Sequence, residues 1–391
     1  MNKELRRKKR YQAEKRFQVY GIIAISLALF FVGLLVFKVF SEGTSAFSRT
    51  MIKVPITFNA EKLGISNIND NDEVENADYY SLVYEQFVKN YPYSNDEEEK
   101  QIIKLLSPDY EFEVKNYFLK NRNQLNKTVN LLLTASDDFD QLHKGNFPRD
   151  IPEDRRRLSN YQLKIYDQFL KEGKIRKIFN NYLFSKGDSR DPELAGFGGA
   201  IYGSFFTILI CLLISFPIAL SAAVYLEEFA PKNKLTDLIE ININNLAAVP
   251  SIVFGLLGLG ILLNVFELPR STALVGGITL SLMTLPRIII PARASLKSVP
   301  PSIREGALAV GASKVQTVFH HVVPLAMPGT LSGTIIGLAQ ALGETAPLLL
   351  IGMVAFVVEL PGSPMDPSAS LPVQVYLWSE SAERGFVEKT S

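Results

Sequence analysis

Two charged side chains interrupt apolar stretches of the sequence and are the first candidates for chemistry. Arg287 is the only charged residue of the run 271–292, and Glu344 is the only one of the run 322–358. A charge inside a bilayer is costly, so such residues usually face a pathway or pair with one another. The sequence therefore predicts a functional role for both charges.

Each of these charges also has a purely structural explanation. Arg287 lies toward the end of its run, where an arginine can snorkel to the interface, and Arg293 either shares its role or lies at the loop edge. Glu344 precedes Thr345 and Pro347, and the proline must loosen a helix there. We expect Glu344 to pair with an arginine of this chain or of a partner, or to be neutral. The alternative is a buried structural hydrogen bond.

The sequence carries no recognisable catalytic centre. It lacks a G-x4-G-K-[ST] phosphate-binding loop, so any ATP hydrolysis must come from a partner. His143, His320 and His321 do not form a metal or catalytic set. The only cysteine, Cys211, lies in an apolar run, where an inert buried thiol is expected. We therefore expect no catalytic residue, no metal and no cofactor on this chain.

The stretch "REGALAVGASKVQTVFHHVVP" (304–324) is too short and too polar to span a membrane. Its signals are Ser302 with Glu305 as a capping box, Gly311 as a left-handed stop, Ser313 with Gln316 as a second box, and Pro324 as the end of the second helix. They predict a helix–turn–helix over residues 302–324. From the residues alone, it either rests on lipid headgroups or docks into a groove on a cytoplasmic partner.

Long apolar runs surround this hairpin and predict a polytopic membrane protein. A span needs about 20 apolar residues to cross roughly 30 Å of hydrocarbon. The expected spans lie near residues 17–40, 197–226, 246–266, 271–292 and 326–356. The first run is too long for the core of a signal peptide, so we expect a retained anchor.

Charge asymmetry sets the expected topology. The tail 1–16 is rich in lysine and arginine, which predicts a cytoplasmic N-terminus rather than a nucleic-acid partner. Counting spans then places residues 41–195 outside and residues 293–324 inside. The latter segment has four lysines and arginines against one acid, as the rule requires. The inside segment 227–245 does not follow the rule, because its acids outnumber its lysines.

The outside segment 41–195 has the size of a domain. Helical periodicity in residues 99–133 and 156–184 predicts a small helix-rich domain. It contains no cysteine, so no disulfide staples it. The segment shows neither a catalytic constellation nor a cluster of metal ligands, which favours an interaction role such as docking a solute-binding protein.

Three glycines recur at helical spacing within the last apolar run. Gly329, Gly333 and Gly337 form a ridge of small residues that lets another helix approach closely. The pattern fits internal packing and a seam with a second subunit equally well.

Glu305-Gly306-Ala307, three residues, Gly311, nine residues and "HVVP" resemble the signature of permease subunits in binding-protein-dependent ABC importers. Three further stretches resemble the phosphate transport permease (PstA) family: "NNLAAVPSIVFGLLGLG" (244–260), "GETAPLLLIG" (343–352) and "LPVQVYLW" (371–378). The signature identifies the importer class, and the last two stretches point to phosphate.

The resemblance implies an all-α polytopic fold, with a MetI-like helical permease core and an extracytoplasmic domain inserted after the first span. It implies a location in the bacterial inner membrane. The residues it assigns to ATPase coupling are Glu305, Gly306, Ala307, Gly311 and Pro324. The candidates for a phosphate pathway are Arg287, Arg293, Glu344 and Thr345.

The resemblance also implies partners. They are a second permease subunit (PstC-like), an ATPase dimer (PstB-like), a periplasmic phosphate-binding protein (PstS-like), inorganic phosphate and membrane lipid. This chain departs from the family pattern at Gly306, His321 and Gln340. The family pattern also ends with a further membrane helix and a basic tail, so we expect the natural chain to continue beyond Ser391.

Two classes of function follow from the sequence. The favoured class is a transport subunit, not an enzyme, that forms half of a phosphate pathway and couples it to ATP hydrolysis. Importers of sulfate, molybdate or phosphonate are the alternatives within that class. The other class is a membrane-anchored extracytoplasmic binding module, which the number of spans after the domain disfavours.

Overall fold

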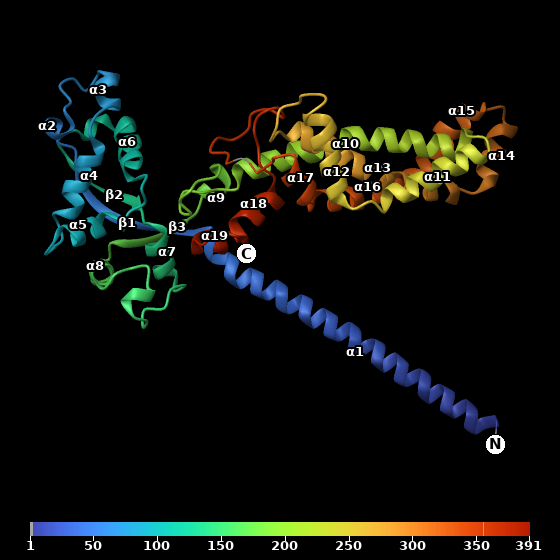
Figure 1. Ribbon diagram of the computed structural model, residues 1–391, viewed down its shortest axis with the longest axis horizontal. Helices are drawn as coiled ribbons and strands as arrows, with labels where there is room; N and C mark the ends of the chain where they lie inside the picture. The colour runs from blue at the N-terminus through green and yellow to red at the C-terminus, as the bar shows by residue number, and fades with distance from the viewer. Residues whose placement is uncertain (1–2, 355) are drawn as a thin grey trace. The chain divides into compact units, whose positions relative to one another are not determined.

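The computed structural model describes residues 3–354 and 356–391, which form two compact units. The first unit contains the chain up to Leu106, Tyr110–Asn180 and Glu383–Ser391. The second contains Ser107–Asp109 and Asn181–Ala382. Figure 1 labels the elements of both units, and each unit is described by itself.

The first unit begins with the long helix α1 (Lys3–Gly43), followed by the 3-10 turn η1 (Thr44–Phe47). The helix runs through the basic tail and the predicted first span without a break. It is long and apolar enough to cross a membrane, and its large apolar side chains, such as Phe17 and Leu29, are exposed. Exposed apolar side chains on such a helix are suited to contact with lipid.

A three-stranded antiparallel sheet organises the rest of this unit. Its strands are β1 (Ser48–Thr57), β2 (Thr128–Thr134) and β3 (Ile175–Phe179), in the order β2-β1-β3. Ile52 of the central strand pairs with Leu133 on one side and with Ile175 on the other. Ile52, Val54 and Ile56 alternate along β1 and are all buried, as expected of a strand with one face on the core.

Short helices surround this sheet (Figure 1). They are α2 (Ala60–Leu63), α3 (Asn71–Glu75), α4 (Tyr79–Val88), α5 (Asp96–Ile103), α6 (Tyr110–Lys120), η2 (Arg122–Gln124), α7 (Asp137–Lys144), η3 (Glu153–Arg155), α8 (Asn160–Lys171) and α19 (Arg384–Thr390). Buried aromatic rings join them, among them Phe58 stacked on Phe118 at 4.7 Å. Phe169 contacts both Phe87 and Phe139. This aromatic core stabilises the unit without disulfides.

The predicted helical stretches of this domain are only partly helical. Residues 99–133 contain α6 but end in β2, and residues 156–184 contain α8 but continue into β3. Gly173 has φ of +63°, which ends the helical path before β3. The short apolar runs at the ends of these stretches fit a helical period and a strand equally well, so periodicity alone does not separate the two. The class is mostly helical, as predicted, with a sheet that was missed.

Among the residues that the structure describes, the second unit contains helices and loops but no β-strand. Its helices are α9 (Tyr182–Ser185), α10 (Gly198–Val224), α11 (Lys234–Ala247), α12 (Ser251–Leu257), α13 (Ala273–Ser298), α14 (Pro301–Ala309), α15 (Lys314–Thr317), α16 (Val323–Leu342), α17 (Ala346–Leu350) and α18 (Leu371–Ser379). Three π-helical turns continue α10, α12 and α15: η4 (Tyr225–Phe229), η5 (Gly258–Leu263) and η6 (Val318–Val322).

Helix α13 lies between α10 and α16 and makes the main contacts of the unit (Figure 1). Small residues allow α10 and α13 to approach closely. A Cβ at Gly277 would lie 2.6 Å from Cβ of Ile210, and a Cβ at Gly276 would lie 3.3 Å from Cγ2 of Thr207. Packing through glycines is the usual way for membrane helices to gain contact area.

Two predicted spans differ from the structure. Residues 246–266 are not one helix, because α11 and the helix 251–263 meet at an angle of 102° beside Pro250. Residues 326–356 are not one helix either, because α16 ends at Leu342 and α17 begins at Ala346. Hydropathy detects apolar length but not direction, so it joined segments that proline and glycine separate.

The glycine ridge of α16 packs inside this chain. A Cβ at Gly329 would lie 2.3 Å from Oγ of Ser295, and a Cβ at Gly333 would lie 2.4 Å from Cγ of Pro291. Both neighbours belong to α13. Of the two explanations left open by the sequence, the structure therefore supports internal packing.

Gly333→Leu is expected to lower the thermal stability of the purified protein, because its side chain would overlap Pro291. Overpacking of this kind typically costs about 1–3 kcal/mol. Thermal unfolding in detergent checks this. The matched control is Gly260→Leu, since a Cβ at Gly260 has no neighbour within 4 Å. Equal melting temperatures for the two variants would contradict the packing described here.

Candidate functional site

The structure brings Arg287 and Glu344 together, as predicted for Glu344. Arg287 extends from α13, and Nη1 lies 3.9 Å from Oε1 of Glu344. The two side chains are only 20% and 17% exposed. In the part of the chain that the structure describes, Nη1 of Arg287 has no hydrogen-bond partner. The pair is therefore close enough to interact but leaves a buried donor free to bind another acceptor.

The break between α16 and α17 positions Glu344. The backbone N–H of Glu344 donates to the carbonyl oxygen of Ala341, and α17 starts at Ala346 with Thr345 as its N-cap residue. Pro347 occupies the first turn of α17, where its missing N–H costs nothing. Glu344 and Thr345 therefore lie on a non-helical corner rather than on a helix face.

Helix α12 packs against this corner. A Cβ at Gly255 would lie 2.7 Å from the Cα of Pro347, so only glycine permits this approach. Gly258, just beyond it, faces Oγ1 of Thr279 on α13. The corner that carries Glu344 is thus held by backbone contacts from a neighbouring helix.

Arg293 lies in a different environment. Its Nη2 is 2.6 Å from Oε1 of Glu240 on α11 and 3.4 Å from Oε2 of Glu227 in η4. Two acids therefore surround this arginine, and its charge is balanced within the chain. The geometry corresponds to the loop-edge explanation of Arg293.

A second arginine anchors the predicted hairpin. Nη2 of Arg304 lies 2.6 Å from Oε1 of Glu228 and donates to the carbonyl oxygen of Leu296 at 2.9 Å. Nη1 of the same residue donates to the carbonyl oxygen of Val299. Because Glu228 follows α10, and Leu296 and Val299 lie at the end of α13, Arg304 ties α14 to both helices.

The turn of the hairpin forms as predicted. Gly311 has φ of +92°, and its N–H donates to the carbonyl oxygen of Leu308. The side chain of Ser313 accepts from the N–H of Gln316, while Gln316 accepts from the N–H of Ser313. The second capping box is therefore confirmed.

Two predicted features of the hairpin are wrong. Helix α14 begins at Pro301, so Ser302 and Glu305 are already helical and form no capping box. Pro324 does not end the second helix, because Lys314–Leu342 is one continuous helix. The π-helical turn η6 ends at Val322, two residues before the proline, and its altered hydrogen-bond pattern accommodates the missing N–H.

The hairpin presents an apolar surface that also carries the exposed charges of Glu305 and Lys314. Glu305 and Gly306 are exposed, while the next residue, Ala307, is buried. The exposed apolar side chains are Leu308, Val310, Val315 and Phe319. Val318 is buried, because it packs into the core of the second unit. An exposed apolar patch on a short rigid hairpin suits contact with another protein or with lipid.

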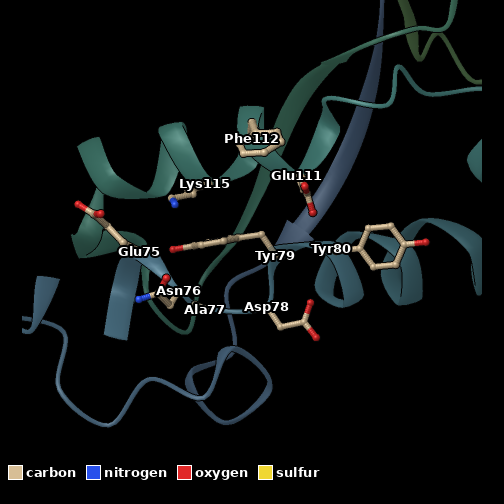
Figure 2. A pocket seen from close by; sticks show the side chains of 9 residues that line it. All are labelled: Glu75, Asn76, Ala77, Asp78, Tyr79, Tyr80, Glu111, Phe112 and Lys115. Carbon is tan, nitrogen blue, oxygen red and sulfur yellow. The ribbon is translucent and has the colours of Figure 1, made fainter. Parts of the chain in front are cut away.

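The first unit carries a small pocket of its own. Figure 2 shows it between the start of α4 and α6, with Tyr79 and Lys115 among its labelled side chains. Its volume is about 190 Å³. The hydroxyl of Tyr79 donates to the carbonyl oxygen of Val74, and burial raises the pKa of Tyr79 to about 12. The phenol therefore stays protonated and structural at neutral pH.

Comparison with known proteins adds to this geometry. Residues 215–373 match the family described as binding-protein-dependent transport system inner membrane component. Residues 4–153 match a domain of unknown function, DUF3333. The DUF3333 match covers α1 and most of the first unit. The transport-component match covers most of the second unit.

Three curated relatives are named as transport permeases. The probable ABC transporter permease protein YqgI of Bacillus subtilis is 33% identical over 41% of this chain and 55% of its own length. The probable phosphate transport system permease protein PstA of Methanocaldococcus jannaschii is 30% identical over 48% of this chain and 65% of its own length. The phosphate transport system permease protein PstA of Haemophilus influenzae is 30% identical over 51% of this chain and 69% of its own length. The chain therefore spans between 55% and 69% of the lengths of these relatives.

Proposed function

Because this chain belongs to the family of binding-protein-dependent transport system inner membrane components, we propose that it is a permease subunit of an ATP-driven phosphate importer. It is a multi-pass membrane protein with four helices long and apolar enough to span, or five if the bent pair is one span. In this proposal the N-terminus is cytoplasmic, and a second permease subunit completes the pathway.

The observation that carries the proposal is the loose pair of Arg287 and Glu344. An anion such as phosphate needs a donor that is buried and not saturated, and Nη1 of Arg287 meets both conditions. Glu344 lowers the net charge of the site, so phosphate binds without being held too tightly to leave. Arg293 has its charge balanced by Glu227 and Glu240, and we assign it to holding α11 and η4 against α13.

Two relatives support phosphate as the substrate, since their names state phosphate transport. An importer of sulfate, molybdate or phosphonate would need the same type of donor. A tagged chain purified from membranes is expected to retain a phosphate-binding protein and an ATPase subunit, and cells expressing the complex are expected to take up phosphate. Co-purification of a sulfate-binding protein instead would contradict the proposed substrate.

The hairpin 301–324 is the proposed contact with the ATPase, because it is short, exposed and anchored on α10 and α13 through Arg304. Movement of an ATPase dimer against the hairpin would pass to these helices through packed contacts. ATP is bound and hydrolysed by that partner. The exposed Glu305 and the apolar side chains beside it are the proposed contact surface.

Glu305→Ala is expected to weaken the association of the ATPase at least fivefold and to leave thermal stability within about 0.5 kcal/mol of the parent. Glu305 is exposed and makes no capping box, so any effect reports on a partner contact rather than on the helix. Pull-down of the ATPase subunit and thermal unfolding measure the two quantities. Glu42→Ala, another exposed acid on a helix, serves as the control. Equal pull-down by both variants would remove Glu305 from the contact.

A further inference from the structure

The end of the described chain returns to the first unit. The second unit consists of residues 181–382 and the short segment 107–109. Glu383–Ser391 belong to the first unit. Helix α19 of this segment contacts α7, α1 and η1. A Cβ at Gly43, the last residue of α1, would lie 2.6 Å from the carbonyl carbon of Ser391. The first unit is therefore completed by a segment that is distant in sequence.

Buried ionic contacts hold this segment on α7. Nζ of Lys144 lies 2.7 Å from Oδ2 of Asp140 and 2.9 Å from Oε1 of Glu388. The side chains of Lys144, Asp140 and Glu388 are only 3%, 9% and 4% exposed. Nε2 of Gln141 also donates to Glu388. A buried carboxylate with a cationic partner and an additional donor is a satisfied group, and removing one partner leaves an unpaired buried charge.

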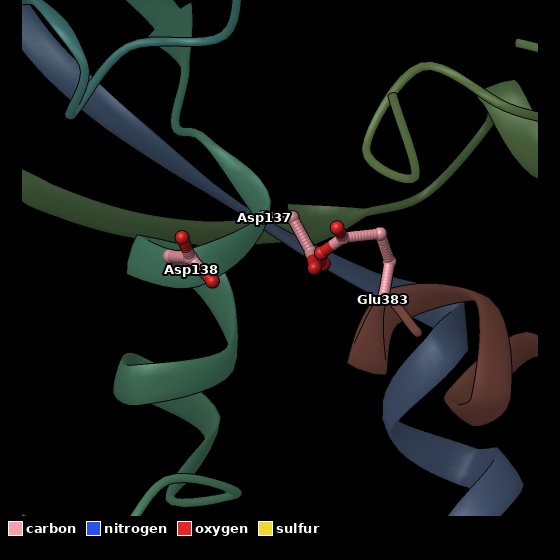
Figure 3. A group of neighbouring side chains, drawn as sticks. All are labelled: Asp137, Asp138 and Glu383. Atoms are coloured by element: carbon pink, nitrogen blue, oxygen red, sulfur yellow. The ribbon is translucent and has the colours of Figure 1, made fainter. Parts of the chain in front are cut away.

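A second set of contacts lies at the start of the segment. Figure 3 shows Asp137 at the start of α7 facing Glu383, with Asp138 next to it. One oxygen from each of these carboxylates lies within 4.8 Å of the others. The guanidinium of Arg157 pairs with Glu383 and lies 3.5 Å from Asp138, so this cluster contains its own counter-charge. The backbone N–H of Gly385 donates to Oδ2 of Asp137.

We propose that the extracytoplasmic domain is a clasp for the chain's own segment Glu383–Ser391, and that this clasp restrains the segment that follows α18 during transport. The docking surface is the face of α7 that carries Asp137, Gln141 and Lys144, together with Arg157. The bound segment supplies Glu383, the N–H of Gly385 and Glu388. The residues on either side of segment 181–382 thereby lie in one folded unit.

The protonation of Asp137 makes this contact depend on pH. Burial raises the pKa of Asp137 to about 7. The N–H of Gly385 opposes this shift, whereas the nearby carboxylates of Asp138, Asp140 and Glu383 add to it. Lys144 and Arg157 are the cations among these groups. Because the docked state has the higher pKa, it binds more protons than the undocked state, so docking weakens as pH rises through about 7. The docking equilibrium is expected to strengthen as pH falls from 8 to 6.

A charge swap tests the clasp in the full chain in membranes. Phe147→Cys and Arg384→Cys place thiols at the edge of the contact, where the guanidinium of Arg384 lies 6.0 Å from the ring of Phe147. In a Cys211→Ala background, a short bis-maleimide is expected to crosslink them efficiently. The reactive thiolate is scarcer at low pH, so crosslinking is normalised to the rate at which a mono-maleimide labels each single-cysteine variant at the same pH. The normalised crosslinking is expected to be higher at pH 6 than at pH 8. Lys144→Glu is expected to reduce crosslinking at least fivefold, and adding Glu388→Lys is expected to restore it.

Phosphate uptake is expected to follow the same order, with a loss in Lys144→Glu and recovery in the swapped double variant. Lys62→Glu is the matched control, because Lys62 forms an exposed ion pair with Glu85 in the same domain. Membrane levels of each variant are measured by immunoblot, and the double variant distinguishes a lost contact from a misfolded domain. Unchanged crosslinking in Lys144→Glu, or full uptake after crosslinking is lost, would overturn the proposal.

Discussion

Gly311→Val is expected to abolish ATP-driven uptake while the protein still inserts into the membrane. Gly311 has φ of +92°, a backbone conformation that a β-branched residue strongly resists. A Cβ at this position meets nothing within 4 Å, so the cost comes from the backbone and not from a clash. Relief of this strain must redirect α14 relative to α15, which changes the surface offered to the ATPase.

Two controls separate the turn from the residue type. Gly311→Asn is expected to retain most uptake, because asparagine tolerates positive φ better than other non-glycine residues. Gly306→Ala is expected to be nearly neutral, since Gly306 is helical and a Cβ there has no close neighbour. Pull-down of the ATPase subunit and an uptake assay measure these outcomes. Full association and full uptake in Gly311→Val would mean that the hairpin only rests on lipid.

Arg287→Gln is expected to lower phosphate uptake at least about tenfold, which corresponds to 1.4 kcal/mol or more of lost binding in the pathway. The substitution removes the charge and the free buried donor but keeps a polar side chain of moderate length. Glu344→Gln is expected to impair uptake as well, because it leaves Arg287 without its nearby counter-charge. The double variant should lose less than the sum of the two effects, since the two residues interact directly.

Arg270→Gln provides the control for these substitutions, because Arg270 is exposed in the turn before α13. Assembly of the complex is expected to be normal in all variants. Normal uptake in Arg287→Gln would favour the snorkelling explanation of Arg287. Additive losses in the double variant would show that the 3.9 Å separation does not couple the two charges.

The membrane helices were largely predictable because their apolar length is a local property. The runs around α1, α10 and α13 could be read directly from composition. The corner at Glu344 was only partly predictable. Pro347 indicated a loosened helix, but not that α16 ends at Leu342 and that α17 starts at Ala346. Local signals also predicted Gly311 and the capping box of Ser313. They misplaced the start of α14, since two prolines before Ser302 override its capping preference.

Pairings across the chain could not be predicted from local patterns. The segment 227–245 seemed to violate the positive-inside rule because of its acids. In the structure, Glu227 and Glu240 pair with Arg293, and Glu228 pairs with Arg304. The acids are thus counter-ions for the basic segment 293–324, and the two segments must be counted together. The same limitation hid the contact between Lys144 and Glu388, which only the folded chain brings together.

Transport by the reconstituted complex tests the central claim most directly. The chain, its second permease subunit and the ATPase are incorporated into liposomes, and radiolabelled phosphate is supplied with the phosphate-binding protein. We predict that uptake requires ATP and that unlabelled phosphate competes with it, whereas sulfate does not. We also predict that Arg287→Gln largely abolishes this uptake. Uptake of sulfate in preference to phosphate, or no ATP-dependent uptake from a fully assembled complex, would contradict the proposed function.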